Sequence, residues 1–492
     1  MDFLDPKRKK AHRRRLLVGY ILVAVAVAMG TLVLLFAAYG YDVNRKTGDV
    51  IQNGTVFLDS SPSGAEITLN GQLQRNKTAT RLVLPGSQQY GIKLSLEGYR
   101  DWNRTFSLEG GKIERLVYAL FIPNKLKVKE NQLYASAPAQ LSQSPDRRWL
   151  LVQQPGQLHT FDMYDLENPA NAPAVITVPA SIQTDPTKTS SIIMREWSND
   201  DRHVLLERVY GDKKEFIMLD TVNAASSINI NTALTVTPSS ITLRDKKYDQ
   251  LYIYNAEGGL LRLGDTKNRT VSGALLSNVI SYKSYGSDII MYAVKDASNA
   301  GKVQVRVREN DKASYLIKSV AESASYLLDI AEYDGTPYYV IGGRVENAAF
   351  VYKDPLPTLK GQSQSALIVS AVLRLDNQQF LSFSTNAKFI SLQSGKDVIV
   401  FDIEGDRQFR VTVPHPVAAA EKIEWIDGFR FAYTSEGQSY VIDFDGSNSQ
   451  QLSPSVNGVR PFFAPDFKSF FTASPSTVVP GRFALSEVSL EK

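Results

Sequence analysis

Hydrophobic and polar residues alternate along most of this chain, but one early segment is apolar without interruption. Residues 16–40 hold no charged side chain. An α-helix rises about 1.5 Å per residue, so a helix over this segment would be roughly 37 Å long. The hydrocarbon core of a bilayer is about 30 Å thick, and a helix satisfies its own backbone hydrogen bonds there. The pattern predicts a transmembrane helix over residues 16–40 that contacts the lipid bilayer.

The charges beside this segment predict its orientation. Residues 1–15 contain seven Lys and Arg residues and two acidic residues, whereas basic and acidic side chains balance just after the segment. Basic flanks stay on the cytoplasmic side of a membrane. We therefore expect a single-pass protein of the cell membrane, with a basic cytoplasmic tail over 1–15 and the remaining domains outside the cytoplasm.

Two other interpretations of the apolar segment compete with this one. Ala26-Val27-Ala28 resembles a signal-peptide cleavage site, but the apolar core of a signal peptide has only about 7–15 residues. The second alternative is a helix buried in the core of a soluble protein. The membrane-spanning interpretation is preferred on length, and whether the anchor is ever cleaved stays open.

A juxtamembrane linker over 41–53 is expected to lead into short alternating segments. Residues 90–96, for example, place apolar side chains at every second position, as in half-buried strands. Asn70-Gly71 lies between two such segments and favours a type I′ hairpin turn, which needs positive φ at both residues. These signals predict a small β domain over residues 54–121.

Four short motifs follow one another in this domain: Ser61-Pro62-Ser63-Gly64-Ala65, Leu69-Asn70-Gly71, Leu84-Pro85-Gly86 and Glu97-Gly98-Tyr99. In order and spacing they resemble the PEGA domain, a β-module of prokaryotic envelope proteins. Ser63 stands where that motif usually has Glu, and the Gly-x-Thr-Pro turn that often follows Gly71 is missing. The resemblance implies a β-sandwich-like, non-catalytic module for presentation or attachment.

From about residue 131 onward one unit recurs eight times, with a turn rich in Pro, Asp, Asn or Gly followed by two strands. Its copies open at 144–152, 198–206, 384–392 and 464–472, and less clearly near Asp245, Tyr285, Tyr333 and Ile426. One such sheet cannot bury its apolar face alone, whereas many sheets around an axis can. A linker over 122–138 and a β-propeller over 139–492 are therefore expected.

The late part of this region, residues 440–452, resembles a strand and Asp-Gly turn of TolB-like and WD-repeat-like propellers. Eight blades are the preferred number. Seven remain open if one unit is miscounted or if one blade is built from both chain ends.

The search for reactive groups predicts no catalytic, cofactor-binding or metal-binding residue. Cysteine is absent, which excludes disulfides and thiolate metal sites. The four histidines are far apart in the sequence, and a structural role is favoured for those in the β repeats: His12, His159, His203 and His415.

Two further segments were candidates for chemistry. Asp443-Phe444-Asp445-Gly446 lacks the remaining ligands of a calcium-binding loop, so a hairpin turn is favoured. Gly361-Gln362-Ser363-Gln364-Ser365 approaches the G-x-S-x-G pattern of a hydrolase nucleophile but lacks its final Gly.

Net charge excludes another class of function. Outside residues 1–15 the chain carries 48 basic and 49 acidic residues, whereas a nucleic-acid-binding domain normally has a basic face. Nucleic acid is therefore not an expected partner.

The sequence as a whole predicts a mainly β protein with one transmembrane helix, a PEGA-like domain and a propeller of seven or eight blades. We expect an extracytoplasmic binding or scaffolding protein without cofactors, whose propeller meets an envelope or surface protein or a glycan. The alternative is an extracytoplasmic hydrolase or lyase that gathers acidic residues from several blades. A sensor is a third idea, and the short tail would then require a separate partner for signalling.

Overall fold

The computed structural model describes residues 6–43, 48, 50–309, 313–361, 366–418 and 420–492. The chain forms two compact units, residues 1–125 and 126–492, which are described separately below. Strands dominate both units, and the chain is mainly β as predicted.

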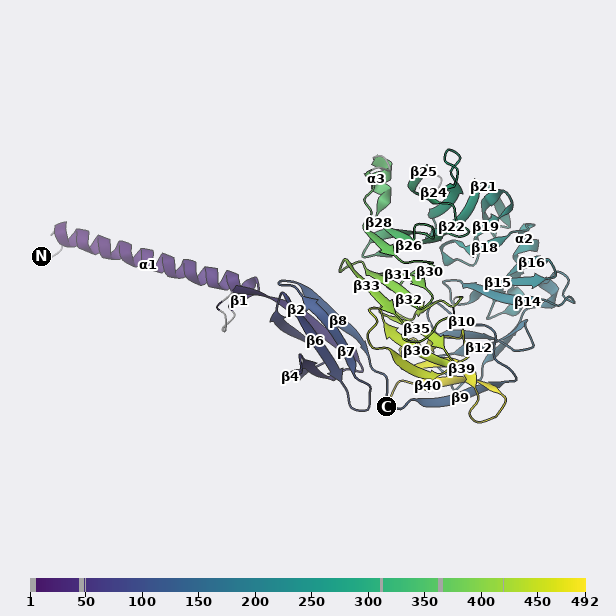
Figure 1. Ribbon diagram of the computed structural model, residues 1–492, viewed down its shortest axis with the longest axis horizontal. Helices are drawn as coiled ribbons and strands as arrows, with labels where there is room; N and C mark the ends of the chain where they lie inside the picture. The colour runs from purple at the N-terminus through teal and green to yellow at the C-terminus, as the bar shows by residue number, and fades with distance from the viewer. Residues whose placement is uncertain (1–5, 44–47, 49, 310–312, 362–365, 419) are drawn as a thin grey trace. The chain divides into compact units, whose positions relative to one another are not determined.

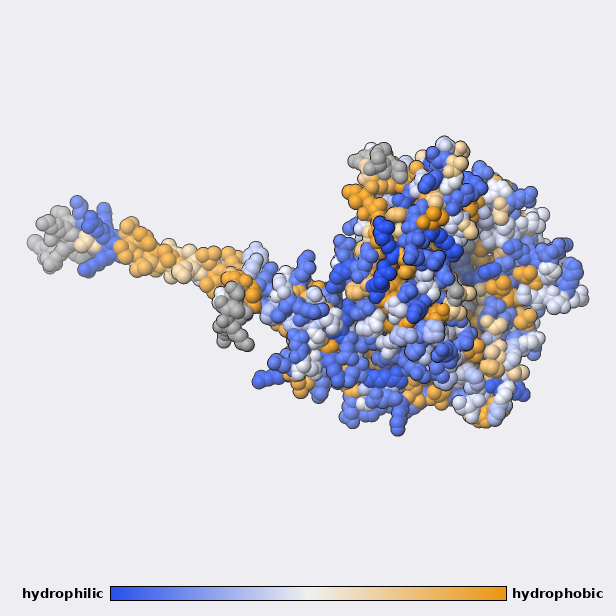
Figure 2. Space-filling model, viewed as in Figure 1, coloured by the Kyte–Doolittle hydropathy of each residue, from blue (hydrophilic) through white to orange (hydrophobic). Residues whose placement is uncertain are grey.

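The predicted apolar helix is present as α1 (Pro6–Ala38), which also includes most of the basic tail. None of its apolar stretch is buried against the described part of the protein, and Figure 2 shows it as a continuous hydrophobic surface. A core helix of a soluble protein would be covered, so that interpretation is wrong. The helix ends two residues earlier than expected, because Gly40 adopts a left-handed φ of 75° that terminates helices readily.

The rest of the first unit consists of two four-stranded sheets, which the chain enters directly after α1. One sheet contains β1 (Tyr41–Val43), β2 (Val50–Ser61), β5 (Thr80–Pro85) and β8 (Ile113–Leu120); the other contains β3 (Glu66–Leu69), β4 (Gln72–Lys77), β6 (Gln88–Ser95) and β7 (Trp102–Leu108). The expected linker over 41–53 is thus partly wrong, because β1 and the start of β2 pair within it.

Alternating side chains build the core of this β domain. In β7 every second residue from Trp102 to Leu108 is buried, and the Trp102 ring meets Tyr118 edge-on at 5.6 Å. The hairpin prediction at Asn70-Gly71 is confirmed, since both residues have positive φ and the flanking strands β3 and β4 pair.

The second unit is a β-propeller of eight four-stranded antiparallel sheets, counted over its described residues (Figure 1). The first four blades are β10 (Leu141–Gln143), β11 (Trp149–Gln153), β12 (Thr160–Asp165) and β13 (Ala174–Thr177); β14 (Ser191–Trp197), β15 (His203–Tyr210), β16 (Lys213–Asp220) and β17 (Ile228–Asn229); β18 (Ser240–Leu243), β19 (Gln250–Asn255), β20 (Leu260–Asp265) and β21 (Thr270–Leu276); and β22 (Val279–Tyr285), β23 (Ile289–Lys295), β24 (Lys302–Glu309) and β25 (Ser314–Ala321).

The last four blades follow in the same way. They are β26 (Leu327–Tyr333), β27 (Thr336–Gly343), β28 (Ala348–Lys353) and β29 (Ala371–Arg374); β30 (Phe380–Phe383), β31 (Phe389–Ser394), β32 (Asp397–Asp402) and β33 (Arg407–Thr412); β34 (Glu424–Trp425), β35 (Arg430–Ser435), β36 (Gln438–Asp443) and β37 (Gln450–Pro454); and β38 (Phe462–Phe463), β39 (Ser469–Pro475), β40 (Phe483–Ser489) and β9 (Lys127–Tyr134). Short helices α2 (Ile230–Leu234) and α3 (Pro355–Gly361) lie in connections, as do the 3₁₀ turns η1 (Ala180–Ile182), η2 (Ala224–Ser226), η3 (Arg244–Lys246) and η4 (Glu257–Gly259).

The eighth blade contains strands from both ends of the propeller sequence. β9 pairs with β40 along seven registered positions, so the expected linker over 122–138 is wrong where it includes this strand. The preferred count of eight is confirmed among the described residues. Strands from both ends of the propeller sequence do build one blade. The number of blades stays eight, because β9 adds the fourth strand to the three that β38, β39 and β40 already form.

Polar contacts tie this closing strand to the first blade. The Tyr134 hydroxyl at the end of β9 donates to an Asp162 carboxylate oxygen at 2.8 Å and lies 2.8 Å from the Tyr164 hydroxyl. Gln143 Nε2 donates to the Phe463 carbonyl across the same junction at 2.7 Å. Apolar side chains of the two blades, including Leu150 and Phe471, share one buried cluster. The ring is therefore closed by backbone pairing and packing together.

The recurring turn of the sequence connects the first and second strands of a blade. In its four clearest copies the fourth residue donates its N–H to the first residue's carbonyl and has a φ near +60°: Arg147, Asp201, Ala387 and Phe467. Asp146 and Asn386 also accept backbone N–H groups within their turns. The Asp or Asn of the repeat therefore stabilises the turn locally.

A basic residue after each of these turns reaches an acid near the end of the third strand. The pairs include Arg148 with Asp165, Arg202 with Asp220 and Lys388 with Glu404, at 2.8, 2.5 and 2.6 Å. In the second blade, burial raises the pKa of Asp220, but the Arg202 guanidinium, two backbone N–H groups and the His203 charge outweigh burial and lower it to about 2.

We predict that Asp220→Asn lowers the free energy of unfolding by about 2 kcal/mol at neutral pH, because hydrogen bonds to a charged group are lost. The folded pKa lies below the unfolded value of about 3.9, so this stabilisation is present above about pH 4 and disappears as pH falls toward 2. Urea unfolding of the full chain in detergent, from neutral pH down to about pH 2, measures the free energy of unfolding of both proteins. Exposed Asp212→Asn is the control, and a penalty for Asp220→Asn that stays constant down to pH 2 would contradict the prediction.

Candidate functional site at the propeller axis

The first strands of the blades line the axis of the ring. First strands of neighbouring blades contact one another, as β22 does β26 and β26 does β30. Trp197 of β14 donates its indole N–H to the Ser142 hydroxyl of β10 at 2.9 Å. Side chains that precede or begin these strands therefore converge from different blades.

The first axial cavity has a volume of about 360 Å³ and is lined by the first, second, seventh and eighth blades. These blades are neighbours because the ring is closed. Its charged lining residues are Glu421, Lys422, Glu424 and Arg460, and apolar or aromatic side chains such as Met194, Tyr433 and Phe462 complete the wall. Lys422 and Glu424 form an ion pair at 3.7 Å.

A second axial cavity of about 160 Å³ is lined by residues at the far ends of first strands and in the turns that follow them, together with Arg460, which precedes β38. Arg460 lines both cavities, so the two adjoin at this side chain. Arg147 faces the smaller cavity together with Trp425 and Phe463. The turn geometry described above holds Arg147 there, since its φ is 67°.

The two arginines are placed on aromatic rings. The Arg460 guanidinium lies 4.6 Å from the Phe462 ring centre, and that of Arg147 lies 4.7 Å from Phe467. Burial lowers the pKa of Arg460, the nearby charge of Glu424 raises it, and the charge of Arg147 lowers it. Burial likewise lowers the pKa of Arg147, opposed by Asp427. Two cations of like charge thus share a partly desolvated space.

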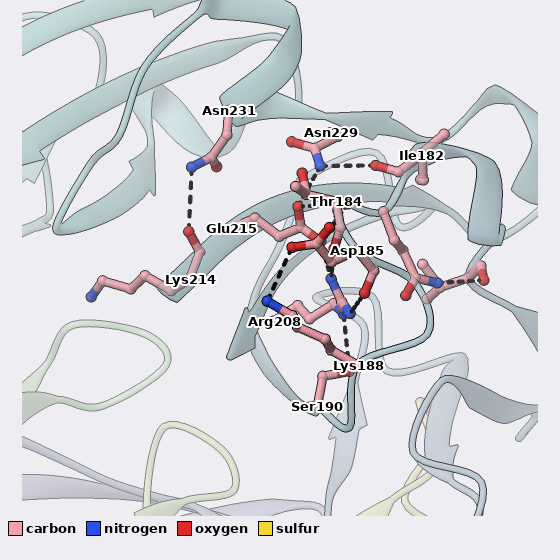
Figure 3. Close-up of polar contacts among 12 residues, drawn as sticks. Ile182, Thr184, Asp185, Lys188, Ser190, Arg208, Lys214, Glu215, Asn229 and Asn231 are labelled. Atoms are coloured by element: carbon pink, nitrogen blue, oxygen red, sulfur yellow. Dashed lines mark hydrogen bonds and ion pairs between the residues drawn. The ribbon is translucent and has the colours of Figure 1, made fainter. Parts of the chain in front are cut away.

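A second polar group lies inside the second blade, where Arg208 and Glu215 are buried opposite each other on β15 and β16 (Figure 3). The exposed fraction of their side chains is 0% and 2%, and the ion pair measures 2.7 Å. Arg208 also donates to the Ser190 hydroxyl and to the carbonyls of Thr184 and Asp185. Asn229 Nδ2 donates to Glu215 at 2.8 Å. Both charges are compensated within the protein, which indicates a structural role.

The histidines remain apart on different elements. Near the Arg208 cluster, His159 Nε2 lies 2.8 Å from the Ser190 hydroxyl, and burial together with the Arg208 charge lowers the pKa of His159. His203 stacks on Tyr248 and pairs with Asp200, while His415 stacks on Tyr440. His12 is exposed on α1. Each histidine in the repeats has local partners, and these contacts fit the structural role expected from the sequence.

The other two candidate segments differ in what the structure says of them. Asp443-Phe444-Asp445-Gly446 forms the predicted turn, with the Gly446 N–H donating to the Asp443 carbonyl at 2.9 Å. Asp445 accepts from Ser447, and Asp443 from Asn448. Gly361 ends α3, and residues 362–365 of the Gly-x-Ser-x segment lie outside the described residues.

Sequence analysis did not single out either axial arginine. Arg147 was noticed only as part of a turn, and Arg460 stands beside Pro461 just before the last blade. Arg147 is the fourth residue of a repeated turn, and Arg460 lies two residues before a first strand. A repeat of known register could therefore have placed both residues near the axis. Their proximity depends on how the ring closes, and the strand that closes it, β9, lies in the segment expected to be a linker.

Comparison by sequence identifies residues 53–120 as a PEGA domain, which confirms the resemblance of this part of the chain. The comparison with curated proteins found no match. The propeller architecture is shared with several solved structures of low sequence identity.

Three of these structures illustrate the likeness. The dihydro-heme d1 dehydrogenase NirN is 13% identical, with 65% of this chain and 66% of that chain aligned and a TM-score of 0.41. The Cps50 (Swd1) β-propeller domain of Myceliophteria thermophila is 10% identical, with 66% of this chain and 99% of that chain aligned and a TM-score of 0.39. Porphyromonas gingivalis dipeptidyl peptidase 4 is 12% identical, with 70% of this chain and 57% of that chain aligned and a TM-score of 0.44. The alignment thus spans less than two thirds of the first and third of these proteins, and no activity is carried over from them.

We predict that Glu215→Gln destabilises the protein by about 3–5 kcal/mol, because it leaves the buried Arg208 cation without its counter-ion. Replacing both residues by apolar ones, Arg208→Met with Glu215→Leu, should recover most of that loss. Denaturant unfolding of the full chain measures both variants. Equal losses for the single and double variants would show that packing, and not charge compensation, is what these residues contribute.

Proposed function

We propose that this chain is a membrane-anchored extracytoplasmic binding protein whose propeller receives a protein or glycan partner at its axis. In this proposal α1 spans the bilayer, the basic tail stays in the cytoplasm, and the PEGA domain and the propeller lie on the opposite side. The length and uncovered apolar surface of α1 support the anchor. The clustering of basic residues at one end supports the orientation.

The axial cavity carries the binding part of the proposal. Its wall is more polar than apolar and places four charged side chains beside aromatic ones, which suits a polar or charged partner. Four blades contribute to it, through first strands and through the segments that lead into them, so a ligand there would contact several parts of the ring at once.

The enzyme alternative stays a prediction. Glu421 and Glu424 line the same cavity, which is the observation that favours a hydrolase or lyase with paired acids. Glu424 is, however, already engaged with Lys422, so the arrangement suits recognition at least as well as acid–base chemistry. Retained binding with Glu421→Gln and Glu424→Gln would favour the binding protein.

The proposal predicts a partner that touches the axial cavity in living cells. A photo-crosslinking amino acid in place of exposed Ala139, which lines the cavity, should capture one defined protein or glycan-bearing component. The same probe in place of Val345, exposed on the fifth blade, is the matched control. Mass spectrometry of the full-length protein isolated from intact cells identifies the product. Identical products at both positions, or none at Ala139, would contradict axial binding.

A further inference from the structure

The axial arginines differ from the basic residues that follow the turns. Arg148 and Arg202 each reach a carboxylate within 2.8 Å. Among the described residues, none accepts a hydrogen bond from the Arg460 guanidinium, and no carboxylate lies within ion-pair distance of it. In the part of the chain that the structure describes, Arg147 donates one hydrogen bond, from Nη2 to the Ile426 carbonyl at 2.5 Å. A guanidinium has five N–H donors, so most donors of this pair lack protein acceptors.

The acids whose charges act on the pair form ion pairs with other cations. Glu424 attracts Arg460 but forms its ion pair with Lys422. Asp427 attracts Arg147 but pairs with Arg430 at 2.7 Å. The two guanidinium groups therefore repel each other, while the acids that attract them are paired with other cations. Desolvation makes this arrangement costly unless a counter-charge enters.

Both side chains line the cavity of about 160 Å³. No acidic residue is among its described lining residues, which otherwise are Gln143, Ser144, Pro145, Thr385, Trp425, Ile426 and Phe463. A cavity of this kind has room for an oxyanion with some of its water. Guanidinium groups bind carboxylate, sulfate and phosphate in a bidentate manner, which suits an anion placed between two of them.

We propose that Arg147 and Arg460 form an oxyanion-binding site at the propeller axis, which takes a phosphate, sulfate or carboxylate group. The larger cavity adjoins it at Arg460 and accommodates the rest of a ligand that carries such a group. This inference rests on the proposed function and names the chemical class that the axis recognises. The relevant chemistry is that of an anionic substituent on a glycan, peptide or small molecule.

The test uses the purified full chain in detergent and three separate probes: inorganic phosphate, inorganic sulfate and acetate. Calorimetric titration should detect saturable binding of at least one probe, and the tightest of the three identifies the preferred group. Arg460→Gln should weaken that binding at least tenfold, because charge-assisted hydrogen bonds are lost. Arg147→Gln should weaken it as well. Arg148→Gln, adjacent in sequence but paired with Asp165, is the matched control and should leave it unchanged.

A second measurement uses the unaltered protein and does not depend on whether the variants fold. Phenylglyoxal modifies accessible arginines, and bound anion should slow modification of Arg147 and Arg460 while Arg148 reacts at its usual rate. Peptide mass spectrometry resolves the three sites. Three results would each overturn the site. One is that none of the three probes binds, and another is that Arg460→Gln binds as tightly as the unaltered protein. The third is that bound anion does not slow modification of either axial arginine.

These outcomes are distinguishable from failure of the proposed function. A partner captured at Ala139 with no oxyanion bound would retain the binding protein and remove the oxyanion site. Oxyanion binding without a captured macromolecule would retain the site and point to a small anionic ligand instead.

Discussion

The propeller depends on one strand pairing, that of β9 with β40. Without β9 the last blade would have three strands and β40 would become its edge strand, a site for pairing with another chain. The Tyr134 contacts with Asp162 and Tyr164 and the shared cluster around Leu150 then join the eighth blade to the first. Closure is therefore both a hydrogen-bonding and a hydrophobic event, and it fixes the distance between two parts of the chain that are more than 300 residues apart in sequence.

The same closure assembles the axial cavities. Arg147 belongs to the first blade and Arg460 directly precedes the eighth, so their guanidinium groups can share a cavity only in a closed ring. Several other charged side chains of the propeller are compensated locally. The Arg208–Glu215 pair is compensated in the second blade, and Arg148 and Arg202 are compensated near the ends of their blades. The axial arginines, by contrast, are partly buried and have no carboxylate partner among the described residues, and a partly buried charge without a partner costs free energy.

Much of this architecture could be predicted from sequence because its signals are local. An uninterrupted apolar segment predicts α1, Asn70-Gly71 predicts its hairpin, and all eight turn units correspond to the connection between the first two strands of a blade. β9 was missed because it is an edge strand whose Lys127, Lys129 and Val128 are exposed, so that it lacks clear alternation. The axial site was missed because the sequence contains no information on which loops the ring brings together. The Arg208–Glu215 pair could have been predicted, because the two residues lie on the two strands of a tight hairpin and face each other directly.

Ring closure is the central claim, and the absence of native cysteine allows a direct measurement of it. Lys129 and Glu487 are directly opposite each other on β9 and β40, at the separation of antiparallel neighbours that a disulfide can bridge. The double variant Lys129→Cys with Glu487→Cys should form one intramolecular disulfide in the folded full-length protein, as mass spectrometry of the linked peptides would show. The pair Lys129→Cys with Glu257→Cys, on the third blade, should stay reduced. A reduced Lys129→Cys/Glu487→Cys variant in native protein, or equal cross-linking in both variants, would contradict a ring closed by β9.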